Sequence, residues 1–414
     1  MKKNITSPGL KYKRIFIALP VMNEMEYLPE LFHSLKKQQF RDFELYSCVN
    51  QPDKWWNDAE RVTICNTNKK ALNYLGLIQD FPVSVIDRSS KGKGWNSRGY
   101  GVGWARKTVM DAIAAEADRN DLIVSLDADT VFNPEYFLSI INSFNKYRRS
   151  VGMAVPYYHR LVDDSEANRA ILRYEIYMRN YAVNLWRIKS PYSYTALGSA
   201  IVIPVWAYRD VGGLTPKKSG EDFYFLQKLR KYGELICYNP EKVYPAARFS
   251  DRVFFGTGPA MIRGREGDWE SYPIYHHTLF DDIKKTYDMF PELYNCDIET
   301  PMSRFLNEQF NDQNIWQPLR KNSTTEQNFV KACHDKVDGL RILQYLKTMH
   351  KLINQSDEKN LFDFLNKYYS GEFKKPDIKP DEFLFGQSPI EELDKIRNFL
   401  VGKEEEYQKS SLLC

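Results

Sequence analysis

The sequence lacks several features that mark common classes of protein. Its six cysteines include no C-x-x-C pair, and in a long chain without an export signal we expect them to be reduced thiols. Charge of one sign is not in large excess either. Lys and Arg number 58 against 54 for Asp and Glu, so nucleic acid is not expected as the main partner.

Long hydrophobic runs are also missing. The apolar run at 15–22 contains Pro20 and is followed by polar residues, which is not typical of a signal peptide. The run at 196–208 is too short to span a bilayer. We therefore expect a cytoplasmic protein without a transmembrane segment, with contact at the inner face of the membrane as an open alternative.

Two phosphate-binding signatures are absent. The chain has no G-x-x-x-x-G-K-[ST] sequence, and no G-x-G-x-x-G opens a helix after the first apolar run. It therefore carries neither the Walker pattern nor the dinucleotide-binding pattern.

What the first third does contain is an alternation of short apolar runs with helical patterns. The expected strands are 14–20, 43–50, 83–87 and 121–127, with helices from about 25–37 and 99–118. This alternation indicates an α/β fold with a mainly parallel sheet sandwiched by helices. Ligands bind such sheets beyond the carboxyl ends of the strands. Pro20, Asn50, Asp87 and Asp127 stand at those ends and should line one crevice.

The composition changes at about residue 286. Strand-like runs vanish, and helical periodicity appears in 341–353. We predict an α/β domain over 1–285 and a helical C-terminal region over 286–414. Its charges alternate in sign, which favours packing on a partner or within the chain. A homodimer and a peripheral membrane contact stay open as alternatives.

The stretch "VSLDADTVF" (124–132) ends an expected buried strand with two carboxylates. Mg²⁺ is typically held by one or two carboxylates together with substrate phosphates, so Asp127 and Asp129 are candidate metal ligands. The alternative is a side-chain-to-backbone turn before the helix that Pro134 begins. Two like charges side by side are costly without a cation, which favours the metal.

A basic, glycine-rich stretch precedes a helix in "SSKGKGWNSRGYGVGWARKTV" (89–109). Glycines let the backbone approach an anion, and helix N-termini favour negative charge. Lys93 and Arg98 are therefore candidates for phosphate binding. The alternative is a solvated basic loop.

Two acids begin a helix in "SGEDFYFLQKLRKYG" (219–233). Glu221 and Asp222 either stabilise the helix through its dipole, or one of them is a general base at the rim of the crevice. The residues alone leave both alternatives open.

Taken in order and spacing, "IALPVMNEMEYLPELFHSL", "GKGWNSRGYGVGWA", "VSLDADTVFNPEYF" and "ALGSAIVIPVWAYRDVGGL…GEDFYFLQKL" resemble family 2 glycosyltransferases. The likeness covers about residues 13–260. It implies the nucleotide-diphospho-sugar transferase fold called GT-A. It also implies a hexosyltransferase-type enzyme that inverts the anomeric centre.

The resemblance further implies a role for each matching residue. Asp222 corresponds to the general base, and Asp127 and Asp129 to the D-x-D that holds Mg²⁺ or Mn²⁺ on the donor diphosphate. The residues expected to bind the nucleotide sugar are Pro20, Asn23, Glu24, Asp87, Lys93, Arg98, Asp127, Glu221 and Arg252. Asp87 would read the edge of the base.

Two departures from the family pattern limit what can be transferred. Many relatives carry an acid pair after the second strand, where this chain has Asn50 and Gln51. Base recognition is then amide-mediated or lies elsewhere. The Q-x-x-R-W motif and membrane helices of the processive synthases are absent, which argues against chain-polymerising export.

Downstream, 247–269 carries four arginines among glycines and is expected to be a loop that closes over the donor or acceptor. Arg248 or Arg252 would meet the diphosphate, and the alternative is an ordinary basic surface loop. His276 is a candidate third metal ligand, although a structural role for it or for His277 is favoured.

We therefore expect an inverting, metal-dependent glycosyltransferase that uses a nucleotide-diphospho-sugar, with a UDP-sugar favoured. The acceptor would be a hydroxyl of a glycan or lipid-linked saccharide, in cell-surface polysaccharide synthesis. One alternative is a nucleotidyltransferase that makes sugar nucleotides, which is disfavoured because "LPVMNEME" lacks the expected Gly-rich signature. Another is a non-catalytic sugar-nucleotide-binding protein, which is disfavoured because Asp129 and Asp222 are present.

Overall fold

The computed structural model describes residues 11–96, 99–250, 256–373 and 382–413. The chain divides into two compact units. The first consists of Met1–Val162, Thr195–Pro259 and Leu412–Cys414, and the second of Asp163–Tyr194 and Ala260–Ser411. The expected domain boundary near residue 285 stays a prediction.

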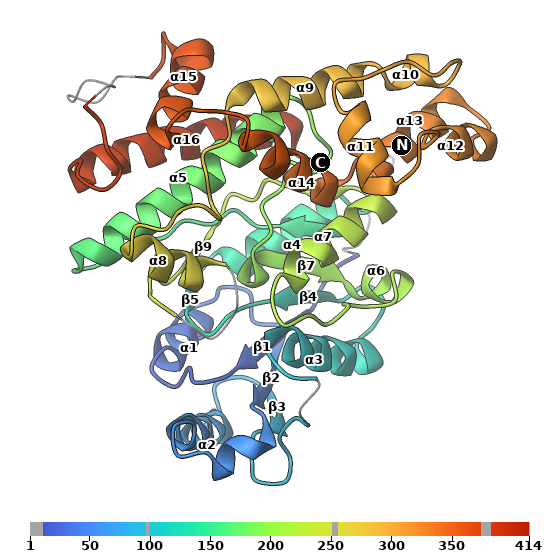
Figure 1. Ribbon diagram of the computed structural model, residues 1–414. Helices are drawn as coiled ribbons and strands as arrows, with labels where there is room; N and C mark the ends of the chain where they lie inside the picture. Colours follow the sequence, from blue (N-terminus) through green and yellow to red (C-terminus); the bar gives the residue numbers. More distant parts are fainter. Residues whose placement is uncertain (1–10, 97–98, 251–255, 374–381, 414) are drawn as a thin grey trace, which may run out of the picture. The chain divides into compact units, whose positions relative to one another are not determined.

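A seven-stranded sheet forms the centre of the first unit, in the order β3-β2-β1-β4-β7-β6-β8. Figure 1 labels β1, β2, β3, β4 and β7 of this sheet. Four neighbouring pairs are parallel, and β7 runs antiparallel to both of its neighbours. The strands are β1 Ile15–Val21, β2 Phe43–Asn50, β3 Val83–Arg88, β4 Leu122–Ser125, β6 Gly152–Ala154, β7 Ile201–Pro204 and β8 Leu235–Ile236. The predicted mainly parallel α/β sheet is confirmed.

Helices pack on this sheet and bury its central strands. All residues of β1 are buried, as expected for a strand covered on both faces. The helical elements of the first unit are α1 Leu28–Lys36, η1 Asp53–Asn57, α2 Val62–Gly76, α3 Val102–Glu116, α4 Tyr136–Lys146, η2 Gly198–Ala200, α6 Val205–Asp210 and α7 Glu221–Tyr232. Helix α3 packs on β1, β2 and β4, which places its buried face behind the carboxyl end of β4.

A small second sheet extends the turn that follows β4. Strand β5 (Thr130–Phe132) pairs antiparallel with β9 (Val243–Pro245). The pairing continues past β9, since the amide of Ala246 donates to the carbonyl oxygen of Asp129 at 3.0 Å. The segment after β9 is thereby fixed beside the two aspartates of the D-x-D.

The second unit is helical, which confirms the prediction of a helical C-terminal part. Its helices are α5 Ser165–Arg187, α9 His277–Asp288, α10 Phe290–Leu293, α11 Ser303–Phe310, α12 Gln317–Asn322, α13 Glu326–Lys336, α14 Gly339–His350, α15 Asp357–Tyr369 and α16 Ile390–Ser411, and α8 (Thr257–Arg265) leads into them. Helix α5 begins where Asp164 accepts hydrogen bonds from the amides of Glu166 and Ala167.

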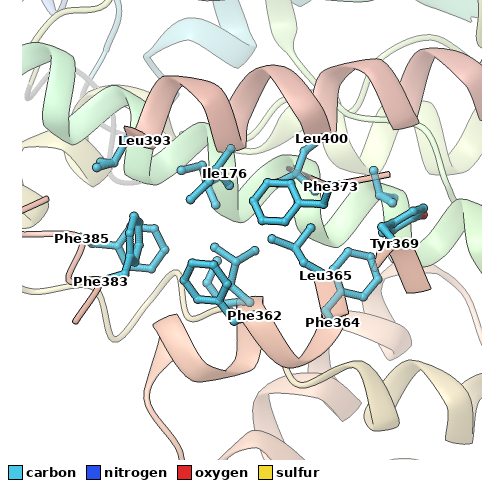
Figure 2. Packing of buried hydrophobic residues seen from close by; sticks show 14 of the residues in the cluster. Ile176, Phe362, Phe364, Leu365, Tyr369, Phe373, Phe383, Phe385, Leu393 and Leu400 are labelled. Carbon is cyan, nitrogen blue, oxygen red and sulfur yellow. The ribbon is translucent and has the colours of Figure 1, made fainter. Parts of the chain in front are cut away.

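The core of the second unit joins α5, α15 and α16. Figure 2 shows Ile176 of α5 and Leu400 of α16 pointing into the same cluster as Phe362 and Leu365 of α15. Buried ion pairs fix α16 along α5: Arg179 bonds Glu404 at 2.5 Å and Arg397 bonds Glu175 at 2.7 Å. Each charge is paired, as burial requires.

Among the described residues, no helix combines the length and the apolar character needed to cross a membrane. Cys48, Cys65, Cys296 and Cys333 are free thiols, as expected. Cys237, in contrast, is disulfide-bonded, so the expectation of a reduced thiol was wrong for this residue.

Candidate active site

Asp127 and Asp129 lie on the turn between β4 and β5. The turn is closed by the amide of Thr130, which donates to the carbonyl oxygen of Asp127 at 3.2 Å. Because β4 is parallel to β1, this turn lies at the carboxyl edge of the parallel strands. The Asp127 side chain is 34% exposed, and the Asp129 side chain is 14% exposed. Asp127 is therefore the more accessible of the two.

Arg106 of α3 is the central cation of the site. Its side chain is 2% exposed. The guanidinium donates through Nη2 to Asp127 Oδ1 at 2.8 Å and through Nε to Glu221 Oε1 at 3.1 Å. Nη1 donates to the Ser125 hydroxyl and, at 3.0 Å, to the carbonyl oxygen of Gly198. Burial opposes its charge, but the two carboxylates outweigh this and raise the pKa of Arg106.

The two acids at the start of α7 have different surroundings. Gly220 precedes them with φ of 74°, a left-handed conformation that suits glycine. Glu221 is buried and bonded to Arg106. Asp222 is partly exposed, and its Oδ1 accepts from the amide of Phe223 at 2.8 Å. Its Oδ2 has no hydrogen-bond partner within the described part of the chain, so this oxygen is able to accept a proton.

The carboxyl of Asp222 is poised near neutral pH. Burial and the neighbouring charge of Glu221 raise its pKa from 3.8 to about 7, while the Phe223 amide and Arg106 oppose the shift. A carboxyl with a pKa near the working pH is suited to general acid–base catalysis.

A second arginine neutralises the other aspartate. Arg248, which follows β9, lies 2.6 Å from Asp129 Oδ2 through its Nη2. The same nitrogen contacts both carboxylate oxygens of Glu24, at 2.9 and 3.1 Å. Its guanidinium also lies over the ring of Tyr27, with 4.1 Å to the ring centre. Burial raises the pKa of Asp129, although Arg248 opposes the shift.

The residues on this turn fit a metal ion shared with a phosphate ligand better than a metal held by protein alone. Among the described residues, no three His, Cys, Asp or Glu side chains form a metal-binding cluster. The turn offers two carboxylates, and Oδ2 of Asp127 has no hydrogen-bond partner in the described part of the chain. Mg²⁺ commonly takes one or two carboxylates plus substrate phosphate oxygens. Asp127 and Asp129 would be its protein ligands.

The loop after β1 is held by a buried amide. Asn23 has a left-handed φ of 58°, and its amide nitrogen donates to Asn68 Oδ1 at 2.8 Å. The Asn68 amide donates in turn to the carbonyl oxygen of Asn50 and to Gln51 Oε1. Pro20 is part of β1, opposite Cys48 of β2.

The amides after β2 are used inside the protein. Asn50 donates to the carbonyl oxygen of Val21 at 3.0 Å and accepts from Trp95 at 3.2 Å. Gln51 donates to Cys65 Sγ and accepts from Asn68. Both side chains are buried. Of the two alternatives for base recognition, these contacts favour recognition elsewhere, because the amides are already paired.

Asp87 and Lys93 form a separate group at the end of β3. Oδ1 of Asp87 accepts from the amides of Ser89 and Ser90, and Oδ2 lies 3.2 Å from Lys93 Nζ. Burial raises the pKa of Asp87, but these hydrogen bonds outweigh it and lower the pKa to about 2. The acid is thus ionised at neutral pH, and one oxygen is committed to the turn.

Three predicted residues are not among the described residues of the first unit. Arg98 and Arg252 lie outside the described residues. His276 belongs to the second unit, where it caps α9: its Nδ1 lies 3.4 Å from the amide nitrogen of Thr278, and its Nε2 lies 3.8 Å from Asp363. Metal binding by His276 stays a prediction.

Arg106 and Asn68 were not identified as candidate site residues from the sequence. The signal for Arg106 was present, because it falls on the face of α3 that also carries Val109, Met110 and Ile113. A charged residue on an apolar helix face is rarely buried without a partner. Asn68 occupies the equivalent position on α2, among buried Cys65, Ala71 and Leu75.

Residues 16–198 match the family model of glycosyl transferase family 2. This match covers less than half of the chain, and it confirms the resemblance seen in the sequence. The match includes the Asp127 and Asp129 pair and ends before Asp222. A comparison with curated proteins gives no match.

Three of the solved structures that are similar to this chain are TarS, PcManGT and GalNAc-T7. TarS of S. aureus (residues 1–349, in complex with UDP-GlcNAc) is 14% identical, with 96% of this chain and 92% of that chain covered and a TM-score of 0.38. The mannosyltransferase PcManGT of Pyrobaculum calidifontis, in complex with GDP-Man and Mn²⁺, is 13% identical, with 90% and 92% covered and a TM-score of 0.34. GalNAc-T7 with UDP, GalNAc and Mn²⁺ is 15% identical, with 73% and 55% covered and a TM-score of 0.37.

Proposed function

We propose that this chain is an inverting glycosyltransferase in which Asp222 is the general base. The observation that carries the proposal is the state of Asp222: a partly exposed carboxyl with an unpartnered Oδ2 and a pKa raised to about 7. Asp222 directly follows Glu221. Arg106 donates hydrogen bonds to both Glu221 and Asp127 of the D-x-D. The family match over residues 16–198 supports the class of reaction.

The proposed donor is a nucleotide-diphospho-sugar, with a UDP-sugar favoured, bound with Mg²⁺ or Mn²⁺ at Asp127 and Asp129. When bound, the cation offsets the negative charge of the departing diphosphate. Asp222 takes the proton from an acceptor hydroxyl, the hydroxyl oxygen forms a bond to the anomeric carbon, and the bond to the diphosphate breaks. One displacement on the face opposite the leaving group inverts that carbon.

The remaining parts of the proposal concern the donor-binding surface and the acceptor. Asn23, Glu24, Asp87 and Lys93 lie at or just beyond the carboxyl ends of β1 and β3, which suits a nucleoside diphosphate. The acceptor would be a hydroxyl of a glycan or lipid-linked saccharide in cell-surface polysaccharide synthesis. A cytoplasmic location and a homodimer stay predictions.

A thermal-shift screen of UDP- and GDP-sugars with Mn²⁺ tests the proposal. A ligand present at about 100 times its dissociation constant stabilises the folded state by about 2.7 kcal/mol. Each stabilising donor is then incubated with the protein, and released UDP or GDP is measured. We expect cation-dependent stabilisation and release by the natural chain.

The control for the screen is Asp129→Ala. In calorimetry with UDP and Mn²⁺, this variant should lose the cation-dependent part of binding. Unchanged binding in Asp129→Ala, with and without EDTA, would contradict the metal assignment. Absence of stabilisation by every nucleotide sugar would contradict the proposed function itself.

A further inference from the structure

Arg106 joins parts of the site that are far apart in the sequence. Its guanidinium contacts Asp127 after β4, Gly198 before β7 and Glu221 at the start of α7. No single element holds the two carboxylates in place. Their relative position depends on one planar group with donors in a fixed fork.

The contacts of Arg106 also separate the roles of neighbouring acids. Oδ1 of Asp127 is bonded to Arg106, and Oδ2 has no hydrogen-bond partner in the described part of the chain. Glu221 is buried against the guanidinium, whereas Asp222 next to it is partly exposed. Arg106 thus holds one oxygen of Asp127, a proposed metal ligand at the donor site, and it also holds Glu221, the residue next to the proposed base Asp222.

We propose that Arg106 is a positioning residue for glycosyl transfer: it fixes Asp127 and helix α7 to one guanidinium and so sets the placement of Asp222 relative to the bound donor. This inference rests on the proposed function of the same site. A lysine cannot replace the arginine, because a single ammonium lacks the fork that spans Asp127 and Glu221.

Gly198 offers a way to move the guanidinium without changing any charged group. A Cβ at this position would lie 2.5 Å from Arg106 Nη2 and 3.1 Å from its Cζ. The clash falls on the arginine side chain, so Gly198→Ala should push it away from Asp127. Gly233→Ala is a matched control, because its Cβ would meet Val151 Cγ1, also at 2.5 Å, at the other end of α7.

The first experiment compares turnover per folded molecule. Donor turnover is measured with the UDP- or GDP-sugar and Mn²⁺ that the natural chain accepts. We expect kcat to fall about 100-fold in Arg106→Lys, the size expected for a reacting group displaced by about 1 Å. We expect a loss of about tenfold in Gly198→Ala and a change of less than about twofold in Gly233→Ala.

The second experiment measures the pH dependence of the rate, which would not change if Arg106 had a purely structural role. Arg106→Gln removes a positive charge near Asp222, so the acid limb of its pH–rate profile should shift to higher pH. Arg106→Lys keeps the charge, so its limb should stay in place while kcat falls. Loss of folded protein alone would lower the rate equally at every pH.

The donor arm of the test uses UDP or GDP with Mn²⁺ in calorimetry. Arg106→Lys and Gly198→Ala should weaken binding, and Gly233→Ala should not. Wild-type rates and affinities in Arg106→Lys and Gly198→Ala, or an equal loss in Gly233→Ala, would overturn the role of Arg106. If the natural chain itself neither binds nor turns over any nucleotide sugar, the proposed function fails instead.

Discussion

Replacing Asp222 by Asn should change stability in a pH-dependent way that follows from the raised pKa. One pKa unit corresponds to about 1.4 kcal/mol, so the shift from 3.8 to about 7 means that the ionised carboxylate costs the folded protein about 4 kcal/mol relative to the protonated form. The folded state binds this proton more tightly than the unfolded state does. The proton-linked stability is therefore present at low pH and is lost as the pH rises through about 7.

The change in the free energy of unfolding can be calculated between two pH values. Between about pH 5 and about pH 8, linkage predicts that titration of Asp222 lowers the free energy of unfolding by about 3 kcal/mol. Asp222→Asn removes this titration. The free energy of unfolding of the variant, minus that of the natural chain, should therefore rise by about 3 kcal/mol between the two pH values.

Urea unfolding followed by tryptophan fluorescence measures this difference. Glu234→Gln is a suitable control, because Glu234 is an exposed acid just beyond the same helix. The comparison separates an effect specific to Asp222 from a general effect of removing a carboxylate near this helix. If the Asp222→Asn difference is the same at both pH values, the anion is not destabilised in the folded state and the argument fails.

The same substitution separates stability from activity. Asp222→Asn should bind UDP with Mn²⁺ and yet lose about 10²- to 10⁴-fold in transfer, the usual contribution of a general base. In the natural chain, transfer should fall below about pH 7 as Asp222 is protonated. Near-wild-type transfer in Asp222→Asn would exclude Asp222 as the base.

Two further predictions concern the supports of the site. Asn68→Leu leaves the Asn23 amide without its partner, so we expect a loss of about 1–3 kcal/mol in urea unfolding and weaker UDP binding; unchanged binding would show that Asn68 does not position the loop. Gly220→Ala places an L-residue at φ of 74° and should cost about 1–2 kcal/mol. Gly220→Asn, which tolerates this conformation better, should lose less, and equal losses would contradict a conformational cause.

The strands and the D-x-D were predictable because their signals are local. The expected strands 43–50 and 83–87 lie within a residue of β2 and β3, since each is a short run rich in apolar residues. Asp127 could be placed at the strand edge for the same reason.

The partners of these residues could not be predicted, because they come from distant segments. Nothing near Asp129 in sequence indicates that β9 would bring Arg248 to its carboxylate. Likewise, the choice between Glu221 and Asp222 depends on Arg106, which lies more than a hundred residues away. Local patterns give the positions of acids, and only tertiary pairing shows which oxygens are already bonded.

Like charges near the D-x-D favour a cation in the proposed reaction. Besides burial, Asp127 raises the pKa of Asp129, and Glu221 and Asp127 raise that of Asp222, because a nearby carboxylate makes a second negative charge less favourable. A diphosphate that entered alone would bring further negative charge to these acids. A divalent cation that entered with it would offset this repulsion, so the charges that hold a base near neutral pH also favour a metal-bound donor over a free one.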